Sequence, residues 1–371
     1  MYNNRMSDNI KIEDLGYNSF FKTSDTVLKL DGFDIARVIA EFKEAYAVKN
    51  TSQEYFARIT GKQIFEASDR VDYPAVGDWV AINVIDNNQA IIHKILPRHT
   101  ILARKHGDKN RQGEKNDIQI IATNINVAFI VESVDRDYSL NRIERYLSIA
   151  QDGGIETEII LNKIDLISRE DLAKKKLELE TRFPNIGIIY TSTVNNNGIN
   201  ELQNNILKGT TYCFLGSSGV GKSTLINRLL KSQSAETAEI SSSTSRGRHT
   251  TTQRQMYFLA NGGIVIDNPG IREVGVLNTN QGLNDVFNQI SEIAQYCKFS
   301  NCTHTNEPGC QVIESVKSGV IDHEKFANYL NLRKEVEYYE MNDLDKKYKD
   351  RQFGKFKKNA IKDLEKYANK Y

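Results

Sequence analysis

Five short apolar runs, separated by polar turns, follow one another in the first third of the chain. They cover residues 37–42, 45–48, 55–59, 78–82 and 90–95. Short runs bounded by turn residues are typical of β-strands, and five at this spacing favour a small barrel of the OB type. We therefore predict an OB-fold-like barrel over residues 33–104. The preceding N-terminal extension, residues 1–32, is low in apolar content, although it contains Phe20 and Phe21 for local docking.

From residue 117 onward the pattern changes to buried strands that alternate with amphipathic helices. Strands are expected at 125–134, 158–161, 186–190, 211–215 and 263–266, and helices at 140–150 and 222–230. This alternation is typical of an α/β domain with a parallel sheet, which we place at residues 117–282. The polar stretch 105–116 is expected to be a linker.

The remaining residues, 283–371, contain helical patterns at 283–296 and 322–341 and are expected to form a helical C-terminal domain. The predicted fold class is therefore a multidomain α/β protein with an all-β N-terminal domain.

A glycine-rich pattern lies between the strand at 211–215 and the helix that follows it. Its residues are Gly216, Ser217, Ser218, Gly219, Val220, Gly221, Lys222 and Ser223, followed by Thr224. This spacing, in a strand–turn–helix context, is that of a phosphate loop. Glycines let backbone N–H groups approach phosphates, and the helix N-terminus adds partial positive charge beneath them. We expect Lys222 to reach the β- and γ-phosphates and the Ser223 hydroxyl to bind Mg²⁺.

A base-reading pattern, Asn162-Lys163-Ile164-Asp165, follows the apolar run 158–161. Ligands of open α/β sheets bind at the carboxyl ends of the strands, which is where this pattern stands. The Asp165 carboxylate can accept from the N1–H and the N2 amine of guanine, whereas adenine offers neither group. We expect Asn162 to bridge to the phosphate loop and the Lys163 stem to lie along the base.

A further base contact is expected after the strand at 186–190, where Ser192 and Thr193 stand. The backbone N–H of Thr193 is the candidate donor to guanine O6. The alternative reading, in which these residues only cap a turn, stays open.

A third pattern, Asp267-Asn268-Pro269-Gly270, follows the strand at 263–266. Asp267 is expected to hold Mg²⁺ through water, and the Gly270 N–H to contact the γ-phosphate. The stretch 241–253 is rich in Ser, Thr, Arg and Gly, a composition typical of a mobile loop. Thr250 or Thr251 in this stretch is expected to complete the Mg²⁺ shell once GTP is bound.

Ile271 stands close to the position where many GTPases place a glutamine that orients the attacking water. Isoleucine has no polar atom for that task. His249 is the nearest candidate in sequence to replace the glutamine. The other reading of His249, a loop histidine that contacts RNA or solvent, also stays open.

The order of these patterns is unusual. In most GTPases the phosphate loop comes first and the Asn-Lys-x-Asp pattern comes later, whereas here Asn162 precedes Gly216. The same parts in this order indicate a circularly permuted GTPase domain.

Three cysteines and one histidine lie within fourteen positions, namely Cys297, Cys302, His304 and Cys310. Cys3His is a common structural zinc set with no open position for chemistry. We expect zinc to organise the C-terminal domain; the alternative is a group of thiols without metal. The fourth cysteine, Cys213, lies in a predicted strand and is expected to be a small core residue.

Overall charge changes this picture little, since 49 Lys and Arg nearly balance 48 Asp and Glu. From residue 346 onward, however, ten Lys and Arg stand against three Asp and Glu, with aromatic residues between them. Such a tail suits an RNA backbone, although a charge run alone is more often a solvated helix face. The chain has no apolar run for a signal peptide or membrane span, and its cysteines fit a reducing compartment, so a cytoplasmic location is expected.

Taken together, these features resemble the RsgA (YjeQ) family of circularly permuted GTPases, which act late in the maturation of the bacterial small ribosomal subunit. The resemblance runs from about residue 34 to the C-terminus and is most specific at 76–80, at 247–252 and at the zinc cluster. It implies GTP and GDP with Mg²⁺, one structural Zn²⁺, and the small ribosomal subunit and its rRNA as partners. It also implies hydrolysis stimulated by the small subunit, with His249 in place of the missing glutamine. We expect a monomer that binds no membrane.

The chain departs from this family's pattern in three respects. Its N-terminal extension is longer, Asn268 stands where Thr is commoner, and Thr193 stands where Ala is usual. None of these changes removes a required group. Two functions therefore remain: a GTPase that times ribosome assembly, or a GTP-gated RNA- or protein-binding paralogue with low intrinsic hydrolysis. An ATP-dependent kinase or ATPase conflicts with Asp165.

Overall fold

The structure is a computed structural model that describes residues 10–28, 30–43, 45–106, 117–135, 138–234, 254–267 and 280–341, with residues 345, 348, 349 and 351. The chain forms two compact units, Met1–Leu277 and Asn278–Tyr371. Among the described residues, no helix is both long enough and apolar enough to cross a membrane.

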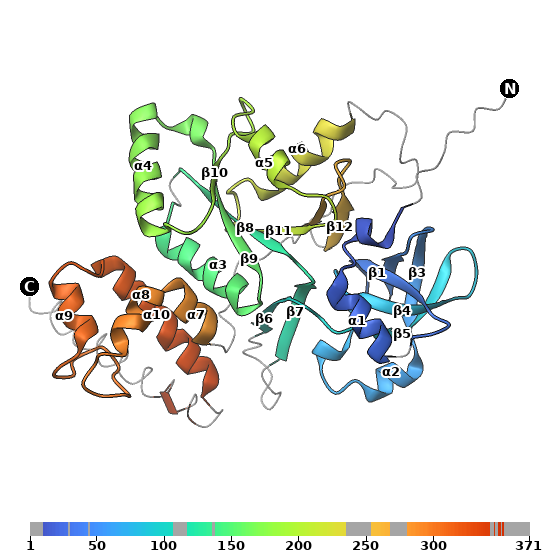
Figure 1. The fold of residues 1–371 in the computed structure, drawn as a ribbon, viewed down its shortest axis with the longest axis horizontal. Coiled ribbons are helices and arrows are strands. Elements are labelled where there is room, and N and C mark those ends of the chain that lie inside the picture. Colours follow the sequence, from blue (N-terminus) through green and yellow to red (C-terminus); the bar gives the residue numbers. More distant parts are fainter. Residues whose placement is uncertain are drawn as a thin grey trace, which may run out of the picture. The chain divides into compact units, whose positions relative to one another are not determined.

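Five strands of the first unit close into a barrel (Figure 1). They are β1 (Asp34–Glu41), β2 (Tyr46–Lys49), β3 (Glu54–Ile59), β4 (Trp79–Val84) and β5 (Gln89–Ile95). They pair in the order β1-β2-β3-β5-β4, and β4 returns to pair with β1. Val38, Val48 and Ile92 are fully buried in the barrel interior. Helix α2 (Gly61–Glu66) and the 3-10 turn η2 (Arg70–Asp72) connect β3 to β4. The predicted five-stranded barrel is confirmed.

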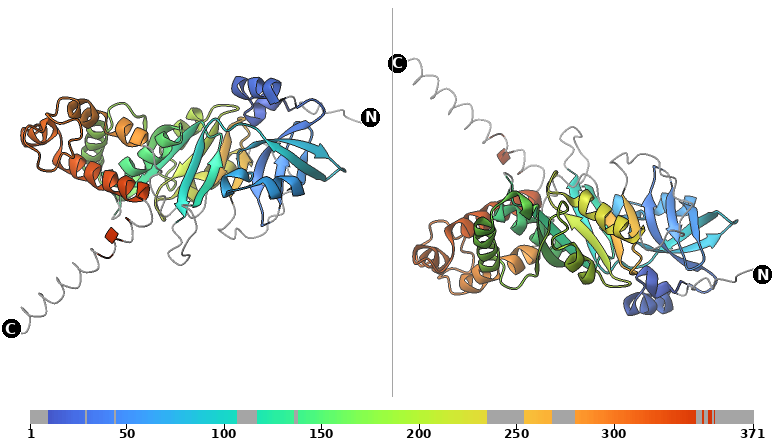
Figure 2. Two further views of the ribbon diagram at one scale, coloured as in Figure 1. Left: turned by 90° about the horizontal axis from the view of Figure 1, so that it is seen from below. Right: turned by 90° about the horizontal axis from the view of Figure 1, so that it is seen from above.

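The segment before the barrel packs onto its outer side (Figure 2). It contains the 3-10 turn η1 (Ile12–Leu15) and helix α1 (Ser19–Leu28). The rings of Tyr17 and Phe21 lie 4.7 and 5.9 Å, between centroids, from the ring of Trp79. Phe21 is buried, whereas Phe20 stays partly exposed beside His99. The described part of the extension, from η1 through α1, is therefore a packed layer that covers Trp79.

Arg37 of β1 joins three separate segments, although its side chain is buried. Its Nη1 donates to the Leu15 carbonyl at 2.6 Å, its Nη2 to the Asn124 carbonyl at 3.0 Å, and its Nε to the Gly77 carbonyl at 3.3 Å. Burial lowers the pKa of the Arg37 guanidinium to about 9, while nearby Asp78 raises it. Because a buried cation requires such acceptors, this residue fixes the N-terminal segment, the barrel and the start of the α/β region together.

A hairpin of β6 (Ile101–His106) and β7 (Asp117–Thr123) forms a separate two-stranded sheet after the barrel. The pairing continues to His106 opposite Asp117. The regular strand thus runs two residues into the stretch expected to be a linker.

The α/β region contains a six-stranded sheet in the order β10-β9-β8-β11-β13-β12. Its strands are β8 (Val127–Ser133), β9 (Glu156–Asn162), β10 (Ile188–Tyr190), β11 (Thr211–Leu215), β12 (Gln255–Phe258) and β13 (Ile264–Asp267). All are parallel except β12. Gln255 of β12 also pairs with Ala40 of β1, so this sheet and the barrel form one eleven-stranded sheet.

Helices lie on both sides of the α/β sheet (Figure 1). Helices α5 (Ile199–Asn205) and α6 (Lys222–Ser234) bury Leu202, Leu225 and Leu229 against it. Helix α3 (Leu140–Asp152) contacts β8 and β9, and the 3-10 turn η3 (Ile164–Leu166) and helix α4 (Arg169–Arg182) lead from β9 to β10. The predicted α/β fold with a parallel sheet is confirmed.

The second unit contains helices α7 (Asn280–Val286), α8 (Asn288–Ala294), α9 (Gln311–Lys317) and α10 (His323–Glu340). The helical pattern predicted at 283–296 corresponds to α7 and α8, which Phe287, a residue outside the helical conformation, separates. Phe287 is buried against Tyr329 of α10, with ring centroids 5.5 Å apart, and this packing turns the chain there. The helix predicted at 322–341 corresponds to α10, which Asp322 caps by accepting from the Lys325 N–H at 2.8 Å.

Candidate nucleotide site and metal centre

Three of the sequence patterns meet at one edge of the parallel sheet. Asn162 is the last residue of β9, Gly216 directly follows β11, and Asp267 is the last residue of β13. These strands are parallel, with β8 between β9 and β11. Their carboxyl ends therefore lie together, at the edge where open α/β sheets bind ligands.

The phosphate loop approaches its neighbours so closely that two of its glycines have no room for a side chain. A Cβ atom on Gly216 would lie 2.2 Å from the Val131 carbonyl oxygen, and one on Gly221 would lie 2.2 Å from Asn162 Nδ2. Gly221 also has a φ of +102°, which L side chains rarely adopt. A Cβ atom on Gly219, at φ +88°, would meet no other atom within 4 Å, so this part of the loop faces open space.

Lys222 is held by the carbonyl groups at the start of this loop. Its ammonium donates to the Gly216 oxygen at 2.7 Å and to the Ser217 oxygen at 2.6 Å. Burial lowers the pKa of Lys222 to about 8, while the charges of Asp267 and Glu132 raise it. The adjacent Ser223 and Thr224 lie in the first turn of α6. The ammonium thus stands within the loop, where a phosphate would offer it a stronger acceptor.

The base-reading residues are tied to the phosphate loop and to the turn after β10. Asn162 Nδ2 donates to the Val220 carbonyl at 2.9 Å, and Asn162 Oδ1 accepts from the Thr191 hydroxyl at 3.0 Å. The Ser192 hydroxyl donates to Asp165 Oδ1 and accepts from the Val194 N–H at 3.2 Å. Asn162 bridges to the phosphate loop as the sequence predicts. Ser192 holds Asp165 in place, a role that the sequence pattern did not assign to it, and Thr193 follows it in the turn.

Several predicted site residues lie outside the described residues. They are His249, Thr250, Thr251 and Gly270, together with Asn268 and Ile271. Asp267, the predicted Mg²⁺ residue, is the last residue of β13, and its negative charge raises the pKa of Lys222.

Other residues at this edge were missed by the sequence patterns. Thr191 orients Asn162. Glu132 is buried near the end of β8, and its Oε1 lies 3.7 Å from Arg142 Nη1. Its negative charge also raises the pKa of Lys222. Tyr146 of α3 forms a side-chain hydrogen bond with Ser217. The signal available for Glu132 was its place at the end of an apolar strand, where acidic residues are seldom buried without a partner.

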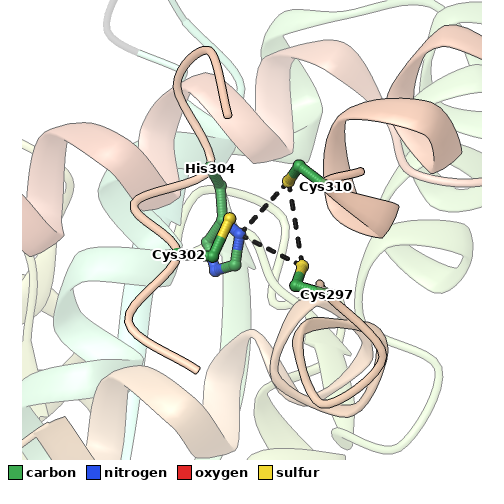
Figure 3. A group of neighbouring side chains, drawn as sticks. All are labelled: Cys297, Cys302, His304 and Cys310. Carbon is green, nitrogen blue, oxygen red and sulfur yellow. Dashed lines mark hydrogen bonds between the residues drawn. The ribbon is translucent and has the colours of Figure 1, made fainter. Parts of the chain in front are cut away.

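The second unit brings the four predicted metal ligands together (Figure 3). The ligand atoms of Cys297, Cys302, His304 and Cys310 all lie within 4.8 Å of one another. The Cys297 and Cys310 sulfurs are 3.8 Å apart, and His304 Nδ1 lies 3.7 and 3.4 Å from them. A tetrahedral Zn²⁺ with ordinary bond lengths requires edges of about 3.8 Å between sulfurs and about 3.6 Å between sulfur and nitrogen. The atoms of Cys297, His304 and Cys310 therefore have the spacing that such an ion requires, and Cys302 Sγ lies within 4.8 Å of each of them as a fourth ligand.

The loop that carries His304 is shaped by backbone and side-chain contacts. His304 itself adopts a φ of 57°, which directs Nδ1 toward the sulfurs. The Glu307 carboxylate accepts from the Thr303 N–H at 2.8 Å and the Thr305 N–H at 3.0 Å. The Thr303 hydroxyl also donates to this carboxylate, and its hydrogen bond together with that of the Thr303 N–H holds the pKa of Glu307 well below its usual range. Hydrogen bonds thus shape the loop on either side of His304.

The fold and the site together define a class: a P-loop GTPase whose base-reading pattern precedes its phosphate loop, that is, a circularly permuted GTPase and a hydrolase. A family model described as RsgA GTPase matches residues 95–277. The chain is also 43% identical over 314 residues to the small ribosomal subunit biogenesis GTPase RsgA 2 of Lactiplantibacillus plantarum, covering 85% of this chain and 86% of that protein. The chain belongs to the RsgA GTPase family.

Solved structures agree with this assignment. YjeQ from Thermotoga maritima is 26% identical, with a TM-score of 0.62 that covers 82% of this chain and 98% of that one. YloQ, a circularly permuted GTPase, is 22% identical with a TM-score of 0.60, covering 84% and 98%, and it supports the fold alone.

Proposed function

We propose that this protein hydrolyses GTP to GDP and phosphate as a timing step in late maturation of the small ribosomal subunit. The observation that carries the nucleotide part is the hydrogen bond from Asn162 to Val220, because it joins the base-reading pattern to the phosphate loop. The ribosomal part is supported by relatives that are small ribosomal subunit biogenesis GTPases, such as that of Lactiplantibacillus plantarum.

In this proposal, each end of the nucleotide has its own residues. Asp165 reads guanine, and the Thr193 N–H contacts guanine O6. The backbone of 216–221 and the Lys222 ammonium bind the phosphates, with the Gly270 N–H on the γ-phosphate. Ser223 binds Mg²⁺ directly, and Asp267 binds it through water. Bound Mg²⁺ would neutralise charge that develops on the phosphates during hydrolysis.

The hydrolytic step is assigned from the sequence. We propose that His249 orients the attacking water in place of the glutamine that Ile271 replaces. Thr250 or Thr251 would complete the Mg²⁺ shell when GTP is bound, so that the segment orders with GTP and loosens after hydrolysis.

The other regions have supporting roles in the proposal. The four ligands Cys297, Cys302, His304 and Cys310 would hold one structural Zn²⁺, which needs no open coordination position. The domain plan consists of the barrel at 33–104, the linker at 105–116, the GTPase domain at 117–282 and the zinc domain at 283–371. The barrel and the basic tail would bind rRNA, and the protein would act as a cytoplasmic monomer.

The deciding experiment measures GTP turnover with and without purified small ribosomal subunits, with large subunits and ATP as controls. We expect strong stimulation by small subunits alone. Tight GTP binding without stimulation would favour the alternative function, a GTP-gated RNA- or protein-binding paralogue with another partner. Equal affinity for ATP and GTP would contradict the assignment of Asp165.

A further inference from the structure

The loop after β8 brings an acidic residue to the base-reading pattern. β8 and β9 are parallel, with Ser133 opposite Asn162, and the Val134 N–H donates to the Asn162 carbonyl at 3.2 Å. This pairing carries the next residue, Asp135, to the level of Lys163.

Asp135 makes a close contact with the Lys163 side chain. The Lys163 ammonium lies 2.7 Å from Asp135 Oδ2, while Asp135 Oδ1 accepts from the Ser133 hydroxyl at 2.8 Å. Both side chains of the ion pair are 30% exposed. The Lys163 backbone is fixed as well, at a φ of 62° at the end of β9. The Lys163 stem is thus held at its backbone and at its ammonium.

The other two base-reading side chains are held in a similar way. Asn162 contacts Val220 and Thr191, and Asp165 accepts from Ser192. Contacts with other protein groups therefore hold the side chains of Asn162, Lys163 and Asp165. We propose that Asp135 is a positioning residue of the guanine site, which holds the Lys163 stem where the base would lie. This inference rests on the proposed GTP site.

Preorganisation explains this ion pair better than stability does. Lysine has a long flexible stem, and ordering it when a ligand binds costs conformational entropy. A lysine that is already held has lost that freedom before the nucleotide arrives. A partly exposed ion pair, in contrast, adds little to folding stability. Losing the negative charge of Asp135 has a second effect on affinity, which opposes the loss of positioning. Removing a negative charge near the site favours binding of an anionic nucleotide.

The test compares nucleotide affinity in Asp135→Asn and wild-type protein, with fluorescent GDP and GTP analogues as probes. We expect the Kd of both to rise by about three- to tenfold, the range for losing the order of one side chain. The kcat at saturating GTP and the urea midpoint should not change, whereas KM should rise. The matched control is Asp171→Asn, which removes an exposed acid 3.4 Å from Lys174 on α4 and should leave both Kd values unchanged.

A double-mutant cycle separates positioning from a general structural role. Lys163→Ala should weaken binding, and Asp135→Asn should add no further loss in that background, because the positioned group is gone. Unchanged Kd values in Asp135→Asn, or an equal loss in the Lys163→Ala background, would overturn the inference. Wild-type protein that binds ATP as tightly as GTP would instead overturn the proposed nucleotide site.

Discussion

The side-chain amide of Asn162 donates to the backbone carbonyl of Val220 at 2.9 Å, although 58 positions separate the two residues. The amide oxygen accepts from Thr191 at the same time. A single buried side chain therefore links the end of β9 to the glycine-rich loop after β11. This close approach is possible because Gly221, next to Val220, has no Cβ atom.

Gly221→Ala is expected to destabilise the nucleotide-free protein by about 2–4 kcal/mol, because strain and a steric clash add together. The new Cβ would lie 2.2 Å from Asn162 Nδ2 at a φ of +102°. Gly219→Ala is the control, since its φ is +88° but no atom lies within 4 Å of its Cβ. Urea unfolding gives the free energy of unfolding of both variants. Equal losses would show that the contact with Asn162 is unimportant.

The affinity for GDP should fall as the pH rises from 7 to 9. Burial lowers the pKa of Lys222 to about 8 in the free protein, and a bound phosphate favours the charged ammonium. Binding therefore takes up a proton above pH 8, and the Kd should rise by up to about tenfold per pH unit there. Fluorescence titrations across this range measure the effect.

A Lys222→Arg variant is the control for this pH dependence. Arginine stays charged throughout the range, so the Kd of this variant for GDP should not change with pH, even if binding is weaker. The effect of Lys222 on folding stability depends on pH in the opposite direction. The folded pKa lies below the unfolded value, so the folded state releases its proton first and this group's contribution to stability grows as the pH rises above about 8. A flat wild-type binding profile would contradict the Lys222 assignment.

Asp165→Asn should change which base the protein prefers. The amide can no longer accept from both guanine donors, and we expect the Kd for GTP to rise by roughly 100-fold. Xanthine carries a carbonyl in place of the N2 amine, so the new amide N–H can donate to it. Competition of GTP, XTP and ATP for the site measures the preference. A variant that still prefers GTP would exclude Asp165 as the base reader.

Cys302→Ser should abolish the bound metal and loosen the second unit while leaving GDP affinity intact. The ligand set loses a thiolate, and structural Zn²⁺ contributes about 10–16 kcal/mol of apparent binding free energy in small zinc domains. The nucleotide residues belong to the first unit and should be unaffected. Metal analysis of the purified full chain measures the loss. Cys213→Ala, at a buried cysteine of β11, should keep its metal; full metal content in Cys302→Ser would refute the ligand set.

The sequence predicted those strands and turns that a short run of neighbouring residues is enough to mark. Alternating apolar runs located the strands of the barrel, and glycine spacing located the turn between β11 and α6. The base-reading and phosphate patterns could be placed at one edge because parallel strands end together.

The remaining features depend on contacts between distant residues, which no local pattern records. The break at Phe287 follows from its burial against Tyr329. The pair of Asp135 with Lys163 depends on the register between β8 and β9. Arg37, an ordinary polar position in a strand pattern, is buried because its three acceptors come from residues 15, 77 and 124.

The N-terminal layer has a practical consequence for anyone who trims this protein to its barrel. A version beginning at Phe33 would lose the Leu15 carbonyl that accepts from Arg37, and would uncover the aromatic surface of Trp79. A buried guanidinium that has lost one of its three acceptors, beside a newly exposed apolar patch, is a combination that favours aggregation over folding. Poor solubility of such a fragment would therefore report on the missing cover, and would carry no information about the strength of the barrel itself.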